Sequence, residues 1–362
     1  MRPPILSDDA ATRGIHPMSP TARILKREMT MRTTHLALVC SLLAPACVNV
    51  PHADYNFGAD AGSGSATCDA PELVVQDLEL DGSAAPDGTP AGCWTLQGKL
   101  TVTGSAVTTL ANLGQLRGVD DLEVANTALT SFDTPLTLQV SGAVYIHDNA
   151  QLATIDRIAP QASRIDSLRV ENNAALTGVG AGLATVEYVT NQTTFLGNAK
   201  LATIDLHQAL RLENGLDVAN DGALTSIEVD ALQSTADLTV KNNAVLTTLS
   251  LGALQFVHGS LTIDTNAKLD LGSAMTSTIT AIDFNLAITN NAALTQIGNL
   301  DHAGGVIGTV NVSGNPQLDY CEARSIGCCV PHPGVAELDN NKNSSCSSHS
   351  WCYSGGSCPY QY

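Results

Sequence analysis

Asparagine recurs about every 23 residues through the central part of this chain, each time after a short apolar pair and before a leucine. The recurring residues are Asn149, Asn173, Asn198, Asn243, Asn266, Asn291 and Asn315. Two stretches show the unit clearly, residues 168–176 (LRVENNAAL) and residues 238–246 (LTVKNNAVL). A repeat of this length predicts a solenoid of stacked coils, in which each coil buries its apolar face against the next.

Each unit opens with two apolar or β-branched residues separated by one other residue. In successive units, the first residues of these pairs are Leu100, Leu122, Val144, Leu168, Thr193, Leu216, Leu238, Leu261, Leu286 and Val310. This alternation predicts a short strand with one buried face. The next apolar residues follow the asparagine at intervals of three, which indicates a bend and not a continued strand. We therefore expect an all-β chain, a parallel β-solenoid of about ten coils of 22–25 residues.

The repeated asparagine is interpreted as a turn residue that belongs to the scaffold. Asparagine tolerates the left-handed conformation, and its amide can bond nearby main-chain groups. If these side chains point inward, they can satisfy buried donors and acceptors of adjacent coils. Asp221 takes this place in the sixth unit, Ser105 takes it in the first, and Asn126 stands one position early in the second.

The motif L-x-I-x-x-N-x-x-L-x-x-L resembles the receptor L-domain family, a leucine-rich-repeat-like solenoid. The resemblance covers roughly residues 95–320 and rests on core and turn positions, so it is specific for fold and says little about activity. It implies a right-handed parallel solenoid with about three short strands per coil. Members of the family mostly bind proteins or support cell walls, and some are exported bacterial proteins.

The charge of the chain argues against several partners. The formal net charge is −18, with 35 acidic and 17 basic residues. An acidic surface repels phosphate backbones and anionic lipids, so we expect no nucleic-acid binding. Self-repulsion that favours solubility is the expected role of this charge, and calcium binding is the alternative.

Residues 31–47 resemble an export signal. A short basic opening precedes an apolar run at residues 36–43, and Ala44, Pro45 and Ala46 lead to Cys47. The run is too short to span a bilayer. Its end resembles a bacterial lipoprotein signal, which predicts lipidation of Cys47 and a place at the outer membrane or cell surface. Cleavage near Ala46 and secretion are the alternative. Residues 1–30 are expected to precede the true start, and residues 48–67 to form a flexible tether.

The remaining cysteines flank the repeats, which predicts disulfide-stabilised caps in an oxidising compartment. The amino-terminal cap, residues 68–98, is expected to contain a Cys68–Cys93 bond. The carboxyl-terminal cap, residues 321–362, is expected to contain a Cys321–Cys346 bond and two bonds that join Cys328 and Cys329 to Cys352 and Cys358. A zinc site built from Cys328, Cys329, His332 and His349 is the alternative, and its spacing matches no known zinc motif.

The last twelve residues hold four of the nine tryptophan and tyrosine residues, namely Trp351, Tyr353, Tyr360 and Tyr362. They could form an exposed recognition site, because such residues dominate interface hot spots. The alternative is that they form the core of a small disulfide module.

Catalytic candidates are scattered. The acidic and histidine pairs are Asp120 with Asp121, His147 with Asp148, Asp205 with His207, and Asp301 with His302. None belongs to a known catalytic motif. We expect no catalytic residues, no cofactor and no metal, and a partner that is a protein or a cell-envelope glycan. The expected binding face is the outward side of the first strands, at Glu123, Tyr145, Arg169, Asp217, Thr239, Thr262, Ala287 and Asn311. A polysaccharide-active enzyme is the alternative, and it would require two carboxylates across a cleft.

Overall fold

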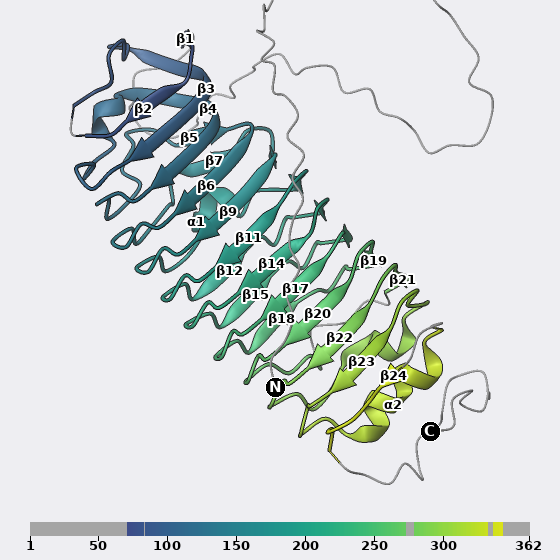
Figure 1. Cartoon of the computed structure of the whole chain (residues 1–362). Helices are drawn as coiled ribbons and strands as arrows, with labels where there is room; N and C mark the ends of the chain where they lie inside the picture. The colour runs from purple at the N-terminus through teal and green to yellow at the C-terminus, as the bar shows by residue number, and fades with distance from the viewer. Residues whose placement is uncertain (1–70, 83, 273–278, 332–335, 343–362) are drawn as a thin grey trace, which may run out of the picture. The chain divides into compact units, whose positions relative to one another are not determined.

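The computed structural model describes residues 71–82, 84–272, 279–331 and 336–342. These residues belong to one compact unit that spans residues 62–362. Within them the chain forms a parallel β-solenoid of about eleven turns (Figure 1), which confirms the predicted all-β parallel solenoid. Strand pairing between successive coils is parallel throughout the named strands.

Three parallel sheets are built from the stacked coils, one of 15 strands, one of six and one of three, and the three-stranded sheet spans only the central coils. The main sheet contains β1 (Glu72–Val75), β2 (Leu78–Leu80), β3 (Cys93–Thr103), β4 (Gln115–Ala125), β5 (Leu138–Val140), β6 (Ala143–His147), β7 (Ile158–Pro160), β9 (Ser167–Glu171), β11 (Thr193–Leu196), β14 (Leu216–Ala219), β17 (Leu238–Lys241), β20 (Leu261–Asp264), β22 (Leu286–Thr289), β23 (Val310–Ser313) and β24 (Ala336–Glu337). The second sheet contains β8 (Arg164–Ile165), β10 (Tyr188–Val189), β13 (Arg211–Leu212), β16 (Ser234–Thr235), β19 (Phe256–Val257) and β21 (Ala281–Ile282). The third contains β12 (Thr203–Asp205), β15 (Ser226–Glu228) and β18 (Thr248–Ser250).

Helices are few and short in the residues that the structure describes. They are the 3-10 helices η1 (Ala111–Leu113) and η2 (Gly298–His302) and the α-helices α1 (Gly180–Leu183) and α2 (Tyr320–Cys329). Helix α2 begins after Asp319, whose side chain accepts a hydrogen bond from the Cys321 amide at 2.8 Å, and it packs against η2 and β23. In the described part of the chain, no helix is both long and apolar enough to cross a lipid bilayer.

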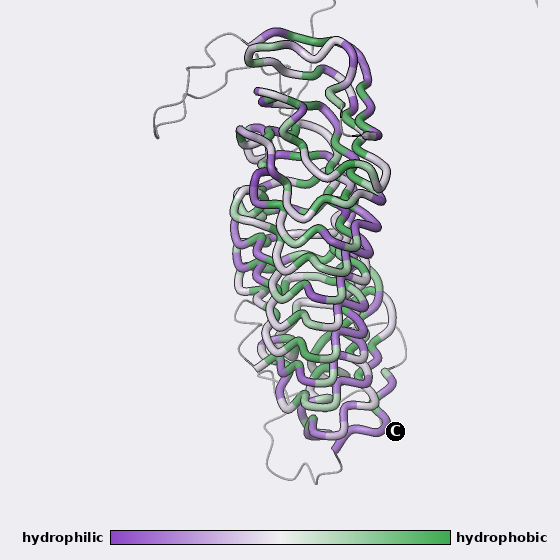
Figure 2. The backbone as a smooth tube through the Cα atoms, turned by 90° about the vertical axis from the view of Figure 1, so that its left-hand side faces the viewer, coloured by the Kyte–Doolittle hydropathy of each residue, from purple (hydrophilic) through white to green (hydrophobic). Residues whose placement is uncertain are grey.

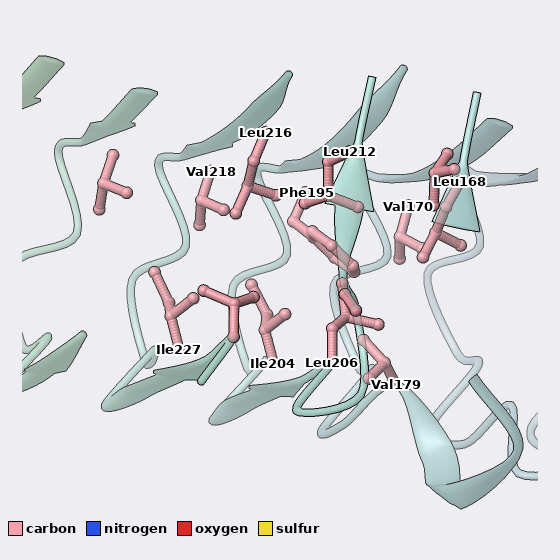
Figure 3. Close-up of a cluster of buried hydrophobic side chains, with 14 of the residues drawn as sticks. Leu168, Val170, Val179, Phe195, Ile204, Leu206, Leu212, Leu216, Val218 and Ile227 are labelled. Carbon is pink, nitrogen blue, oxygen red and sulfur yellow. The ribbon is translucent and has the colours of Figure 1, made fainter. Parts of the chain in front are cut away.

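The core lies between the three sheets and is built from aliphatic residues in columns. Leu168 and Val170 of β9 point toward the side where Ile204 and Ile227 of the third sheet lie (Figure 3), and all four are fully buried. Polar segments recur at the same corner of successive coils (Figure 2), while the apolar segments face inward. Because burying one such side chain stabilises a fold by about 1.5–3 kcal/mol, repetition of these columns compensates for the scarcity of aromatic residues.

The asparagine ladder is buried, as the sequence predicts. All seven repeated asparagines and Asp221 have no exposed surface. Each side-chain oxygen accepts a hydrogen bond from the main-chain N–H of the rung before it; for example, Asn243 N–H donates to Asn266 Oδ1 at 3.1 Å. The amide nitrogen donates to a carbonyl oxygen of the preceding coil, as Asn266 Nδ2 does to Val240 at 2.9 Å. The ladder is therefore a continuous chain of hydrogen bonds that joins successive coils.

The ladder extends beyond the predicted asparagines at both ends. Thr127 donates to Asn149 Oδ1 from its main-chain N–H at 3.0 Å and from its hydroxyl at 2.7 Å. At the other end, the Asn315 N–H donates to Asn341 Oδ1 at 3.2 Å. Thr127 and Asn341 are thus the terminal rungs within the described residues.

The left-handed residue of each turn differs from the one expected. It is the residue immediately before the rung, such as Asn172 (φ 56°), Asn242 (φ 57°) or Gly197 (φ 70°). The reason is geometric: the left-handed residue turns the chain, and the next side chain then points inward to bond the neighbouring coil. Asn126 (φ 56°) is likewise the turn residue before Thr127, so the expectation that it is a displaced ladder residue in a shorter turn was wrong.

The main sheet continues past the residues in which the repeat is recognisable. Leu78 pairs with Leu100, and Ala336 pairs with Val310, so both stand in the column of first strand residues. The inward positions of the first of these strands are Leu78 and Leu80, which are buried although no asparagine follows them. The additional strands explain why the stack has about eleven turns where about ten were expected.

Candidate functional site

The outward residues of the main sheet form one row across the coils. Parallel pairing joins Glu123 to Tyr145 and Tyr145 to Arg169, and the same register continues to Asn311 and Glu337. The eight residues predicted for a binding face are therefore brought together, and all are partly exposed. The row also includes Thr194, between Arg169 and Asp217, which the sequence prediction omitted.

One end of this row carries a dense group of interacting side chains, here called the β4–β9 cluster. It consists of Lys99, Glu123, Tyr145, His147, Asp148, Arg169 and Glu171. The members come from β3, β4, β6 and β9 and from the turn after β6. They lie 24–26 residues apart in sequence where they interact across coils, so only the stacking of coils brings them together.

Tyr145 lies at the centre of the cluster. The guanidinium carbon of Arg169 is 4.3 Å from the centroid of the Tyr145 ring, and the His147 ring stacks on it with centroids 4.0 Å apart. The Tyr145 hydroxyl donates to Glu171 Oε2 at 3.2 Å, and Arg169 Nε donates to Glu171 Oε1 at 2.9 Å. Burial, followed by the negative charge of Glu171, raises the pKa of Tyr145. These contacts hold the phenol and the guanidinium in fixed orientations.

Two carboxyl groups of the cluster, Glu123 and Asp148, have lowered pKa values. Lys99 Nζ lies 2.5 Å from Glu123 Oε2, and this hydrogen bond is the main cause of a lowered Glu123 pKa. His147 joins two carboxylates: its Nε2 is 3.2 Å from Glu123 Oε1, and its Nδ1 is 2.8 Å from Asp148 Oδ2. The bond to His147 lowers the pKa of Asp148. The sequence prediction treated His147 and Asp148 as a solitary pair and missed these partners, because nothing local in the sequence links them to Glu123.

Glu123 and Asp148 differ from the general acid of a glycosidase in the direction of their pKa shifts. A glycosidase needs one carboxyl group whose pKa is raised so that it can protonate the leaving oxygen. Glu123 and Asp148 instead have lowered pKa values. Among the described residues, the carboxyl with a clearly raised pKa is Asp221, which is fully buried in the ladder.

The other catalytic candidates whose side chains are described either bond to an adjacent coil or are exposed to solvent. Asp205 Oδ1 lies 2.6 Å from His207 Nδ1, and both side chains are exposed to solvent. Asp121 Oδ1 accepts a hydrogen bond from the Ala143 amide at 2.7 Å and so helps to hold the next coil. Asp120 accepts from the Ser141 hydroxyl at 3.1 Å. The side chains of Asp301 and His302 lie outside the described part of the structure.

A shallow polar hollow lies farther along the same face. Its volume is about 210 Å³. The lining residues are Gln192, Thr193, Thr194, Asn214, Gly215, Leu216, Asp217, Asp237 and Thr239. Gly215 has φ 102°, and a Cβ at this position would clash with the main chain of Asp237, so glycine allows the close approach of the next coil. The hollow supplies hydroxyl, amide and carboxylate groups beside the predicted row.

Several predicted site residues lie outside the described residues. They are Cys47, Cys68, Cys346, Cys352, Cys358, His332, His349, Trp351, Tyr353, Tyr360 and Tyr362. Cys328 and Cys329 belong to α2, but their side chains are not described, so neither the predicted bonds nor the zinc alternative is tested. Cys93 begins β3, and Cys321 is buried in α2. Among the described residues, no group of three or more histidine, cysteine, aspartate or glutamate side chains is placed to hold a metal ion.

In comparisons with known proteins, the chain matches no protein-family model, no curated protein sequence and no solved structure.

Proposed function

We propose that this chain is a non-catalytic recognition protein, and that its ligand contacts the β4–β9 cluster on the outward face of the main sheet. The observation that carries the proposal is that the Arg169 guanidinium lies over the Tyr145 ring and that both side chains donate hydrogen bonds to Glu171. Tyrosine and arginine dominate interface hot spots because they offer large contact areas together with hydrogen bonds. Their fixed orientations reduce the entropy that binding would cost.

The ligand is a protein or a cell-envelope glycan. The cluster presents cationic groups, carboxylates and one phenol within a few ångströms, which suits a partner with both donors and acceptors. The polar hollow on the same face adds further hydroxyl and amide groups. The expected likeness to receptor L-domains agrees with this assignment, because proteins of that family mostly bind other proteins or support cell walls.

A binding experiment with the full chain tests the proposal. The immobilised protein is probed with a glycan array and with soluble fragments of bacterial cell wall. The variants are Tyr145→Ala and Arg169→Ala, and the control is Thr262→Ala, which alters the same outward row on β20. We expect at least a tenfold loss of affinity in each cluster variant, which corresponds to about 1.4 kcal/mol, and no change in the control.

Equal binding by all the variants, with melting temperatures like that of the parent, would show that the ligand does not contact the cluster. Release of shorter sugars from a polysaccharide by the parent protein would instead favour the enzyme alternative. The melting temperatures are needed because Tyr145 and Arg169 also stabilise the local packing.

Export and anchoring complete the proposal. The signal-like residues 31–47 support export and lipidation of Cys47 at the outer membrane or cell surface, with secretion as the alternative. We also propose disulfide caps, Cys68–Cys93 and Cys321–Cys346, because Cys93 and Cys321 stand at the two ends of the described stack. Right-handed winding is proposed because parallel crossover connections are nearly always right-handed.

Mass spectrometry of the native, non-reduced protein tests both modifications. A diacylated amino-terminal Cys47 and a peptide that joins residues around Cys321 and Cys346 are the expected products. A Cys47 without acyl chains would contradict lipidation, and free thiols at all the flanking cysteines would contradict the caps.

A further inference from the structure

Asp221 occupies a place that asparagine occupies in the neighbouring rungs of the ladder. Its Oδ1 accepts hydrogen bonds from Asn198 N–H at 2.6 Å and from Asn198 Nδ2 at 3.1 Å. Its own N–H donates to Asn243 Oδ1 at 3.0 Å. These bonds match those of an asparagine rung, so Asp221 Oδ1 takes the role of the asparagine oxygen.

The other carboxyl oxygen of Asp221 therefore stands where its neighbours have an amide nitrogen. That nitrogen donates to a strand carbonyl one coil back: Asn198 Nδ2 donates to Val170 O at 2.9 Å, and Asn243 Nδ2 donates to Val218 O at 3.2 Å. Pairing of Val170 with Phe195 and of Phe195 with Val218 identifies Phe195 O as the equivalent acceptor for Asp221. Asp221 Oδ2 is buried and has no hydrogen-bond partner among the described residues.

An ionised carboxylate fits this position poorly. It would place an oxygen without a hydrogen beside carbonyl oxygens, and it would bury a charge, which is costly unless the charge is paired. A protonated carboxyl carries one hydrogen and can donate it as the amide nitrogen of the other rungs does. The ladder therefore requires a hydrogen at this atom.

The surroundings of Asp221 also favour the protonated form of its carboxyl group. Burial is the main cause that raises its pKa to about 6, and the negative charge of Asp217 on β14 adds to this, while the bonds from Asn198 oppose it. Strand β11 contributes no titratable residue. On β17 the charged residue is Lys241, whose charge acts on Asp264 of the next strand.

We propose that Asp221 folds as a neutral carboxylic acid whose Oδ2–H completes the ladder, so that the junction of β11, β14 and β17 strengthens on acidification and weakens as the pH rises. The fold thus contains a pH-sensitive rung near the middle of the stack. It lies in the turn after β14, the strand whose residues Leu216 and Asp217 line the polar hollow.

The direction of the pH effect follows from proton uptake. Below pH 3.8, the ordinary pKa, the carboxyl is protonated in both the folded and unfolded states. Between pH 3.8 and about 6 only the folded state retains the proton, so stability falls as the pH rises. Above this range the carboxyl is ionised in both states, so its effect on stability no longer changes with pH. A pKa difference of about two changes the unfolding equilibrium constant by about 100-fold.

The test compares the full chain with Asp221→Asn in denaturant unfolding at several values between pH 4 and pH 8. Other carboxyl groups contribute equally to both proteins, so their difference isolates Asp221. We expect the equilibrium constants for unfolding of the two proteins to be similar near pH 4. At pH 8 the constant of the variant should be about 100-fold smaller than that of the parent. Asp217→Asn is the matched control, and it should retain most of the pH dependence of the parent.

A direct titration supports or overturns the proposal independently of variant folding. The ¹³C chemical shift of the Asp221 carboxyl in the parent protein should report a proton that is lost near pH 6. Titration at or below pH 4, or a difference between parent and Asp221→Asn that does not change with pH, would show that the carboxyl is ionised in the folded protein and would overturn the proposal.

Discussion

Replacement of Asn266 by alanine tests whether the ladder stabilises the solenoid. Asn266 is fully buried, and its side chain accepts hydrogen bonds from the Asn243 N–H at 3.1 Å and from Asn243 Nδ2 at 3.3 Å. It also donates to Val240 O at 2.9 Å and to Asp264 O at 3.1 Å. Alanine removes all of these bonds and leaves the backbone conformation of the turn allowed, because the left-handed residue is Thr265.

The expected cost follows from these contacts. Loss of the acceptor leaves the Asn243 N–H buried without a partner, which costs ~1–3 kcal/mol, and each lost bond to a carbonyl oxygen removes ~0.5–1.5 kcal/mol. We therefore expect the free energy of unfolding to fall by about 2–6 kcal/mol. The effect should be local in origin, because each coil of a solenoid contacts only its neighbours.

Urea unfolding followed by circular dichroism measures this change, with the urea dependence checked for two-state behaviour. The matched control is Asn214→Ala, an exposed asparagine whose side-chain bonds are 3.3 and 3.4 Å long. It should lie within about 0.5 kcal/mol of the parent, as surface substitutions usually do. An Asn266→Ala protein as stable as this control, with an unchanged urea dependence, would refute the view that the ladder stabilises the stack.

Two further predictions concern the core. Phe195→Ala should lower the free energy of unfolding by about 3–5 kcal/mol, because Phe195 is fully buried. The control Phe284→Ala, at an exposed position, should change it little. Similar melting temperatures for the two variants would contradict the core assignment. Thr193→Val should raise stability by about 1 kcal/mol in urea unfolding, because the buried Thr193 hydroxyl has no hydrogen-bond partner among the described residues and stands between Leu168 and Leu216. A less stable Thr193→Val protein would indicate that the hydroxyl is hydrogen-bonded in solution.

The candidate site could be predicted only in part. Alternation along each strand identifies Glu123, Tyr145 and Arg169 as outward residues, and the pairing of coils confirms that they lie in one row. Their partners could not be identified in the same way. Lys99 and His147 each bind Glu123 from a different coil, and outward positions carry no apolar pattern that would reveal such neighbours.

The turns, too, could be predicted only in part from the sequence. A recurring asparagine predicts the place of each turn, but which of two successive residues is left-handed depends on how the side chain must point to reach the next coil. Asn126 and Thr127 illustrate this, since the threonine hydroxyl replaces the amide and the asparagine forms the turn. The sequence signal at Asn341 is equally weak, because the described strand before it, β24, has two residues.

The sequence by itself determined the period of the coils, the phase of the strands and the buried columns, because these depend on residues close together in one coil, where alternation and turn chemistry act directly. Only the tertiary structure decided which side chains meet between coils. The β4–β9 cluster and the hydrogen required at Asp221 arise from contacts over 22–26 residues, and the positions of such contacts depend on how coils of unequal length stack.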